Sequence, residues 1–220
     1  DLGTSGTKTV LFDTNGNPVA SKTIEYPLYQ PQDGWAEQEP LDWWNASCTG
    51  IKAVLSKSGI DGHAVKGLGI SGQMHGLVML DKKGNVLRDS IIWCDQRTEE
   101  ECRIITEKVG AEKLVEITAN PALTGFTASK ILWVQNHEPE IFEKCAHILL
   151  PKDYLRYKLT GEFATEVSDA SGMQLLDVPK RCWSPTMISS LSLTESMLPK
   201  VYESFEISSA VSEEGTRATG

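Results

Sequence analysis

The chain has 220 residues with a formal net charge of −9, and 40% of its residues are hydrophobic. This length and composition predict a globular protein of one large or two small domains, with enough apolar side chains for a core. The acidic charge argues against nucleic acid or an anionic membrane as the main partner, and no apolar run is long enough to cross a bilayer. Five scattered cysteines without a C-x-x-C pair predict reduced thiols in a cytoplasmic protein, not a disulfide framework or a zinc site.

The N-terminal part of the chain predicts a β-hairpin. Residues 7–13 (TKTVLFD) have the composition of a strand, and an Asn-Gly-Asn-Pro turn leads into a returning strand over residues 19–26. The same pattern recurs where residues 76–81 (GLVMLD) precede a Lys-Lys-Gly-Asn turn and a further strand from Val86. The similarity indicates two hairpins and is too short to indicate a fold-level repeat.

A helix and a short strand are predicted between the two hairpins. The helix begins after Pro40 and ends at residues 57–59, and the apolar residues 65–70 are typical of a buried strand. We expect Trp43 and Trp44 to anchor the core and loops and not to contact a ligand. Spacings of three and four give the helix one apolar face at Leu41, Trp44, Cys48, Ile51 and Leu55.

The second half of the chain predicts three more helices. Thr98 with Glu101 matches a capping box, which starts a helix that ends near Gly110. Residues 129–136 predict another helix, and residues 151–159 predict a third, with proline in its first turn and glycine just past its end. This order of strands and helices, without a long linker, predicts an α/β protein with a mixed sheet flanked by helices.

The chain opens on the segment DLGTSGTK, in which two glycines bracket hydroxyl side chains. A hairpin with this tip would expose backbone N–H groups, which together with Thr4, Ser5 and Lys8 would bind phosphate oxygens. Asp1 would face a hydrated Mg²⁺, because this ion needs few carboxylates and keeps several waters. The alternative is a plain β-turn with ordinary turn residues. The segment is not a P-loop, because G-x-x-x-x-G-K-[ST] is absent.

A second candidate loop is ISGQMHG, residues 70–76. Two glycines bracket Gln73, Met74 and His75 at the end of the predicted buried strand, where polar side chains are well placed to meet a ligand. Glutamine offers a donor and an acceptor, and histidine offers a donor and a switchable proton, which suits a sugar or polyol. The alternative is a hairpin connection with a surface histidine, and the residues alone leave both interpretations open.

A third candidate is IIWCDQR, residues 91–97. Trp93 beside Asp95 and Arg97 suits a sugar, because a ring face packs on C–H groups while charged groups bind hydroxyls. The alternative is an Asp95–Arg97 ion pair at the surface, which would contribute little free energy.

These segments together resemble a known family. DLGTSGTK is similar to the first phosphate loop of the actin, Hsp70 and sugar-kinase superfamily, and ISGQMHG resembles the sugar-binding segment of xylulose kinases within the FGGY carbohydrate kinases. Further stretches resemble the same family, so that the likeness extends over nearly all 220 residues. These stretches are GWAEQEPLDWW, IIWCDQR, NPALTGFTASKILWVQNHEP and LLPKDYLRYKLTGEFATEVSDASGMQLLDV.

The resemblance implies a ribonuclease-H-like fold and an ATP-dependent kinase that phosphorylates D-xylulose at its 5-hydroxyl with Mg²⁺. It implies that residues 1–220 form the first, sugar-binding domain, and that ATP and D-xylulose bind between this domain and a second one. It implies that Asp1 is the catalytic carboxylate near the Mg²⁺ and phosphates, and that Thr4, Ser5 and Lys8 face the phosphoryl groups. It implies that Met74 and His75, with Gln73 beside them, contact the sugar. Weaker candidates for sugar contacts are Trp93, Asp95 and Arg97.

The family carries its catalytic base in a Gly-Asp-Asn segment at the start of the second domain, and no such segment occurs in this chain. We therefore expect negligible kinase activity from the chain alone, because half a cleft supplies no base and does not exclude water. We also expect a strand upstream of Asp1, and a homodimer is compatible with the full-length enzyme. The alternatives are a kinase for ribulose, gluconate or another polyol, a non-catalytic sugar-binding domain, and an actin-like or Hsp70-like ATPase, against which the Gln-Met-His-Gly segment argues.

Overall fold

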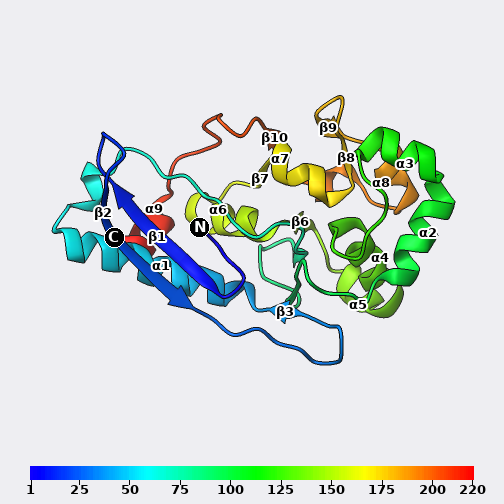
Figure 1. Ribbon diagram of the computed structural model, residues 1–220, viewed down its shortest axis with the longest axis horizontal. Coiled ribbons are helices and arrows are strands. Elements are labelled where there is room, and N and C mark those ends of the chain that lie inside the picture. Colours follow the sequence, from blue (N-terminus) through cyan, green and yellow to red (C-terminus); the bar gives the residue numbers. More distant parts are fainter.

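The computed structural model describes all 220 residues as helices, short strands and connecting turns. The helices are α1 (Pro40–Ser58), α2 (Glu99–Val109), α3 (Ala111–Thr118), α4 (Thr127–His137), α5 (Pro139–Phe142), α6 (Pro151–Thr160), α7 (Val167–Ala170), α8 (Pro185–Ser190) and α9 (Glu213–Thr219). The strands are β1 (Gly6–Phe12), β2 (Pro18–Glu25), β3 (Glu37–Gln38), β4 (Val78–Leu80), β5 (Ser90–Ile91), β6 (His147–Leu149), β7 (Ala164–Glu166), β8 (Leu176–Asp177), β9 (Cys182–Trp183) and β10 (Lys200–Tyr202). Figure 1 shows the β1–β2 hairpin and α1 at one end of the molecule and helices α2 to α5 at the other.

The strands pair in five two-stranded ladders. Four ladders are antiparallel (β1–β2, β3–β5, β4–β6 and β8–β9), and β7 pairs with β10 in parallel. An isolated bridge between Leu77 and Ile91 joins β3–β5 to β4–β6, so these four strands are neighbours. Parallel and antiparallel pairs combined with helices are what the predicted α/β class requires.

The β4–β6 ladder is buried on both faces and separates two hydrophobic clusters. Because successive side chains of a strand point to opposite faces, Leu77 and Met79 belong to one cluster and Val78 and Leu80 to the other. The larger cluster includes five residues of α4, and the smaller one includes Trp43 of α1, which is a core residue as predicted. A strand that is covered on both sides must be apolar throughout, which explains the continuous run in GLVML.

Both predicted hairpins are confirmed, and the same aspartate-centred turn closes each of them. Asp13 accepts hydrogen bonds from the backbone N–H groups of Asn15 and Asn17 and from the Asn17 side-chain amide, at 2.8, 2.9 and 3.0 Å. Asp81 accepts the equivalent three bonds in the second hairpin, at 2.7 to 2.9 Å. The repeated sequence pattern therefore reflects shared turn chemistry.

Helix α1 is confirmed, but its most buried residues are not those of the predicted apolar face, of which Trp44, Cys48, Ile51 and Leu55 are half-buried. Leu41 of the predicted face is 43% exposed. Small residues occupy much of the buried face because the helix packs closely on β1, where a Cβ at Gly50 would overlap the side chain of Thr9. A prediction that weighs only large apolar side chains does not detect such a face. The buried residues are Pro40, Trp43, Ala46, Ser47, Gly50 and Val54.

The predicted strand over residues 65–70 is wrong. The segment pairs with no strand and is largely exposed, with Leu68 50% exposed. Its apolar side chains suggested burial, but a strand also needs a neighbouring backbone, and none lies beside it. The three later helices are confirmed as α2, α4 and α6. The Thr98 side chain does not cap α2, however, because its hydroxyl is hydrogen-bonded to that of Ser129 at 2.9 Å.

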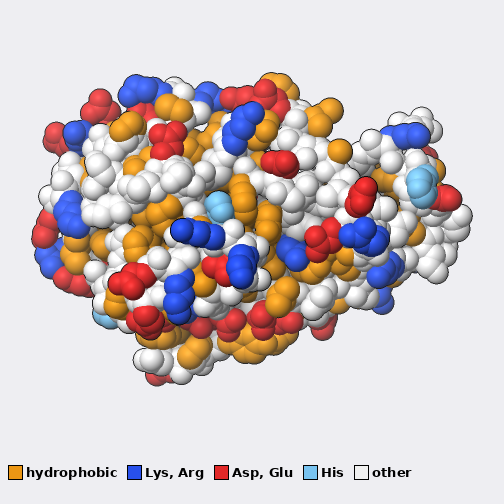
Figure 2. Space-filling view, turned by 180° about the vertical axis from the view of Figure 1, so that it is seen from behind, with side chains coloured by type: hydrophobic (Ala, Val, Ile, Leu, Met, Phe, Trp, Pro, Cys, Tyr) orange, Lys and Arg blue, Asp and Glu red, His pale blue; other side chains and the backbone are white.

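The surface carries charges of both signs. On the face opposite to that of Figure 1, acidic and basic side chains alternate with hydrophobic ones (Figure 2), so the net charge of −9 is not concentrated in one patch there. None of the helices combines the length and the apolar character that a bilayer crossing requires. All five cysteines are unpaired.

Candidate functional site

The opening loop forms a tight hairpin with a polar tip. The Gly3 N–H donates to the Gly6 carbonyl at 3.1 Å, which closes a turn around Thr4 and Ser5. The backbone N–H groups of Thr4 and Ser5 donate to no acceptor within the chain. Two adjacent free N–H groups at a turn make a favourable place for an anion.

Three side chains hold the tip of this hairpin in place. The Tyr26 hydroxyl donates to the Gly3 carbonyl, and the Gln38 amide donates to the Thr4 carbonyl at 2.7 Å. The Trp93 indole N–H donates to Thr4 Oγ1 at 2.9 Å. Because Thr4 Oγ1 accepts from Trp93, its own proton is free to donate to another oxygen, such as that of a phosphate.

Asp1 and Lys8 lie at the base of the same hairpin. Both are exposed, and the Lys8 N–H donates to the Asp1 carbonyl at 2.9 Å. No group of three or more histidine, cysteine or acidic side chains in the chain is arranged as a metal cage. A Mg²⁺ ion held mainly by substrate phosphates and waters needs only one or two carboxylates. Asp1 therefore fits a water-mediated contact to such an ion, and the chain does not offer a closed metal site.

The second loop lies directly beside the first. The Leu2 N–H donates to the Ser71 carbonyl at 2.7 Å, and the Gln73 N–H donates to the Leu2 carbonyl at 2.6 Å. Gln38 links the two loops through its side chain, because its oxygen accepts from the Gln73 amide at 2.9 Å while its nitrogen donates to Thr4. The structure thus joins two segments that are about 70 residues apart in the sequence.

The glycines of the second loop allow close packing and do not adopt positive φ. A Cβ at Gly72 would lie 2.9 Å from the Cβ of Leu2, and a Cβ at Gly76 would overlap Pro151 at the start of α6. The residue with the left-handed backbone is His75, with φ 66°. Such a conformation is uncommon for a non-glycine residue and costs roughly 1 kcal/mol or more, so neighbouring contacts must hold it.

The His75 ring is fixed by contacts on two sides. Its Nδ1 lies 3.1 Å from the Gly172 carbonyl oxygen, and its ring meets Phe126 edge-on with centroids 4.6 Å apart. A Cβ at Gly172 would overlap the ring, so glycine is required there. Met74, the preceding residue, is 52% exposed. The loop therefore presents one exposed apolar side chain beside one fixed ring.

The surroundings keep His75 neutral. Burial, and then the nearby charge of Lys130, lower its pKa to about 4, against a smaller opposite effect of the Gly172 carbonyl. Because a carbonyl only accepts, Nδ1 carries the proton and Nε2 is left as an acceptor. The side chain is thereby suited to accept a hydrogen bond from a hydroxyl group.

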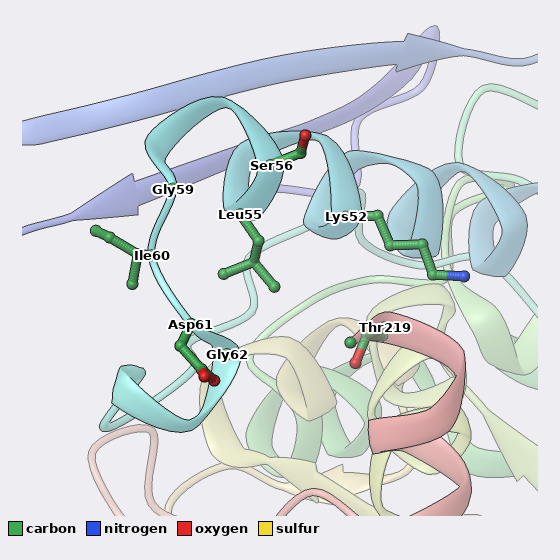
Figure 3. A pocket seen from close by; sticks show the side chains of 9 residues that line it. Lys52, Leu55, Ser56, Gly59, Ile60, Asp61, Gly62 and Thr219 are labelled. Carbon is green, nitrogen blue, oxygen red and sulfur yellow. The ribbon is translucent and has the colours of Figure 1, made fainter.

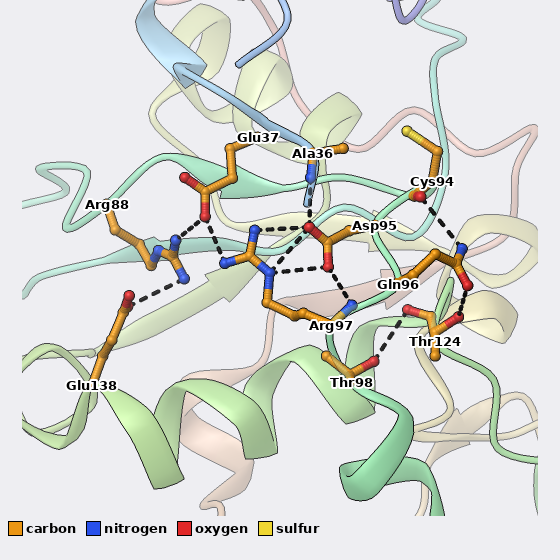
Figure 4. A network of polar contacts seen from close by, with 10 residues as sticks. All are labelled: Ala36, Glu37, Arg88, Cys94, Asp95, Gln96, Arg97, Thr98, Thr124 and Glu138. Carbon is orange, nitrogen blue, oxygen red and sulfur yellow. Dashed lines mark hydrogen bonds and ion pairs between the residues drawn. The ribbon is translucent and has the colours of Figure 1, made fainter. Parts of the chain in front are cut away.

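Asp95 and Arg97 form a buried network of hydrogen bonds and ion pairs with Ala36 and Glu37 (Figure 4). The Asp95 carboxylate accepts from the Ala36 N–H at 2.6 Å and from the Arg97 backbone and guanidinium at 2.7 to 3.0 Å. Arg97 also pairs with Glu37 at 2.7 Å, and its guanidinium lies 3.6 Å from the centroid of the Trp35 ring.

The exposure of this network decides what it can contact. The Asp95 side chain is 0% exposed and that of Arg97 is 1% exposed, whereas Trp93 is 46% exposed. The alternative of a surface ion pair is wrong, because the pair is buried. A direct contact between Asp95 or Arg97 and a sugar stays a prediction. Their geometry supports a different role, in which they hold the strand end that positions Trp93.

Three residues of the site were missed by the sequence analysis. Gln38 links the two loops, Gly172 supports the His75 ring, and the buried Lys130 contacts the His75 carbonyl oxygen. Gln38 and Gly172 lie far from the loops in sequence and carry no local signal. Lys130 offered one, because a lysine within the apolar stretch ASKILWV is unusual unless its charge is used.

A cavity of about 480 Å³ lies apart from these loops, between the end of α1 and the end of α9 (Figure 3). It shares no residue with the three candidate segments, and its ionisable side chains are Lys52 and Asp61. We therefore do not include it in the candidate site.

Comparisons with known proteins agree on one family. The model of the FGGY family of carbohydrate kinases, N-terminal domain, matches residues 1–220. A xylulose kinase of Escherichia coli (strain K12) is 44% identical over 220 residues, which cover 100% of this chain and 45% of that protein. The chain thus spans about half the length of the curated relatives it matches.

Solved structures show the same fold. A crystal structure of a "xyloylose kinase" from Brucella ovis has a TM-score of 0.91 at 38% identity, covering 97% of this chain and 44% of that one. Plasmodium falciparum glycerol kinase with ADP has a TM-score of 0.91 at 25% identity, covering 99% of this chain and 45% of that one. These likenesses confirm the predicted ribonuclease-H-like fold of the actin, Hsp70 and sugar-kinase superfamily.

Proposed function

Because the chain belongs to the FGGY family of carbohydrate kinases, we propose that it forms the sugar-binding half of an ATP-dependent kinase that phosphorylates D-xylulose. The observation that carries the proposal is that hydrogen bonds join the opening loop to the second loop, with the Gln38 side chain bonded to both Thr4 and Gln73. A phosphate-binding tip and a hydroxyl-binding loop in direct contact suit the transfer of a phosphoryl group to a sugar.

The first loop would face the phosphates. The free N–H groups of Thr4 and Ser5, the Thr4 hydroxyl and the Lys8 ammonium are donors, and phosphate oxygens are acceptors. Asp1 would hold Mg²⁺ through water, and the ion would neutralise charge that develops on the phosphates during transfer. Within this chain, the contribution to catalysis is therefore positioning and charge stabilisation.

The second loop would face the sugar. His75 Nε2 would accept a hydrogen bond from a sugar hydroxyl, Met74 would cover an apolar part of the ligand, and the exposed Trp93 ring would pack on C–H groups. Gln73 would act mainly by keeping the loops together, since its side chain is 8% exposed and its amide N–H already donates to Gln38. Its Oε1 has no partner in the chain.

A second domain would complete the site. The relatives are about twice as long as this chain, and Asp1 is the only carboxylate within the segments DLGTSGTK and ISGQMHG themselves. We propose that the catalytic base and the adenine pocket belong to that second domain. The chain alone would then bind sugar weakly and turn over negligibly.

A coupled ADP-release assay on the two-domain enzyme tests the proposed reaction. D-xylulose should support turnover with a kcat/KM at least tenfold above those for D-ribulose, D-gluconate and glycerol. The 220-residue chain, assayed alone, should release ADP at the rate of the buffer control. Turnover that favours glycerol or D-gluconate would show a kinase of the same family with another substrate.

A further inference from the structure

Lys130 is a buried lysine whose side-chain nitrogen contacts the second loop. It lies in the first turn of α4 and is 0% exposed. Residues 127–134 of this helix are all buried. Its Nζ donates to the carbonyl oxygens of His75 at 2.9 Å and of Gly125 at 2.5 Å. Lys130 therefore ties the second loop to the segment that leads into α4.

These contacts act on the residue with the unusual backbone. The His75 carbonyl oxygen accepts from Lys130 and also from the Thr127 hydroxyl at 3.1 Å. Phe126, on the same connecting segment, supplies the edge against which the His75 ring packs. The beginning of α4 and the residue before it thus contact both the left-handed backbone and the ring of His75, with Gly172 on the other side of the ring.

Burying the Lys130 ammonium has an unfavourable desolvation free energy. Burial lowers the pKa of Lys130 to about 7, although the Asp95 carboxylate acts in the opposite direction. An apolar side chain of similar length would avoid this desolvation cost, and replacing buried charges by apolar groups is often stabilising. A contribution to stability alone therefore does not explain the lysine, whereas the two carbonyl contacts do.

We propose that Lys130 is a positioning residue of the sugar site, which fixes the orientation of His75 by holding the carbonyl oxygens of His75 and Gly125. This inference rests on the proposed function for its effect on sugar, but its effect on the His75 ring is independent of any ligand. Lys130 does not itself have to touch the sugar.

The test compares Lys130→Met with a matched control in the full protein. Gln135→Met is on the same helix and removes a side-chain N–H that donates to the Leu191 carbonyl at 2.7 Å, away from the second loop. Gln135→Met leaves the Leu191 carbonyl without this donor, and Lys130→Met leaves the Gly125 carbonyl without its lysine donor. Lys130→Met also removes the desolvation cost of the buried ammonium, so it should not be the less stable of the two variants. Lys130→Gln keeps an uncharged N–H donor group on a shorter side chain, so its effect on the His75 ring should lie between those of the wild type and Lys130→Met.

The ligand-free readout is the proton position on the His75 ring, measured by nitrogen–proton correlation on histidine-labelled protein and assigned with His75→Ala. The wild type and Gln135→Met should show His75 protonated at Nδ1, and Lys130→Met should show a mixture of the two neutral forms. An unchanged Nδ1–H form in a folded Lys130→Met variant would overturn the proposal, whatever the protein binds.

The second readout is the KM for D-xylulose in the two-domain enzyme. Lys130→Met should raise it about tenfold or more, while the KM for ATP changes less than twofold and Gln135→Met leaves both unchanged. A rise that is equal in Lys130→Met and Gln135→Met would indicate a merely structural role. If the ring responds as expected but no variant or wild type binds D-xylulose, the proposed substrate fails and the positioning role stands.

Discussion

Replacing Gly172 by alanine should displace the His75 ring without straining the backbone. The new Cβ would overlap the imidazole, whereas the φ of Gly172 is one that alanine adopts freely. Displacement breaks the Nδ1 hydrogen bond to the Gly172 carbonyl, about 1 kcal/mol, and the edge contact with Phe126, about 0.5–1.5 kcal/mol. We therefore expect Gly172→Ala to lower the free energy of unfolding by about 2 kcal/mol and to weaken sugar binding about tenfold or more.

A double-mutant cycle isolates this effect. In a His75→Ala background no ring remains to be displaced, so adding Gly172→Ala should be neutral or slightly stabilising. Gly67→Ala serves as the control glycine, because a Cβ there meets nothing within 4 Å. Urea unfolding gives the stabilities, and titration with D-xylulose gives the affinities. An equal cost of Gly172→Ala with and without His75 would refute the reasoning.

Three further predictions concern turns, pH and the opening loop. Gly84 and Gly16 both have φ near 80° in the two sister hairpins, but only a Cβ at Gly84 would overlap Tyr157. Gly84→Ala should therefore lower the unfolding free energy by at least about 1 kcal/mol more than Gly16→Ala in urea. Burial raises the pKa of Asp153 to about 7, above its unfolded value, so its contribution to stability is largest at low pH and is lost as pH rises to about 7. The unfolding free energy of the wild type relative to Asp153→Asn should thus fall by roughly 1 to 3 kcal/mol between pH 5 and pH 8, and a flat difference would contradict this. Trp93→Phe removes the indole N–H that holds the opening loop, worth about 1 kcal/mol, and should raise the KM for ATP about fivefold in the ADP-release assay; an unchanged KM would show that the contact is dispensable.

The sequence predicted those parts of the fold that depend on local chemistry. The two hairpins were predictable because an aspartate and a following Gly-Asn pair set each turn, and α6 was predictable because Pro151 starts it and Gly161 ends it. The strand at residues 65–70 was not, because pairing depends on a neighbouring backbone that the segment itself does not encode. The most buried residues of α1 were mispredicted because Gly50 and its small neighbours are buried by close approach to β1.

The candidate site was predictable in its loops but not in its supports. Glycine brackets and polar side chains indicated both loops, and the resemblance to sugar kinases added their roles. The contacts of His75 with Gly172 and Lys130 span 97 and 55 residues in the sequence, and such pairs have no local signature. Asp95 and Arg97 suggested a sugar contact by residue type, while their burial removes them from the surface.

The most direct test of the account is a calorimetric titration of D-xylulose into the chain, with His75→Ala and D-ribulose as controls. The account predicts saturable heat for D-xylulose and a Kd for D-ribulose that is at least tenfold higher. It predicts no detectable binding of D-xylulose to His75→Ala. Binding of D-xylulose that is unchanged in His75→Ala would contradict the assignment of the sugar to the second loop.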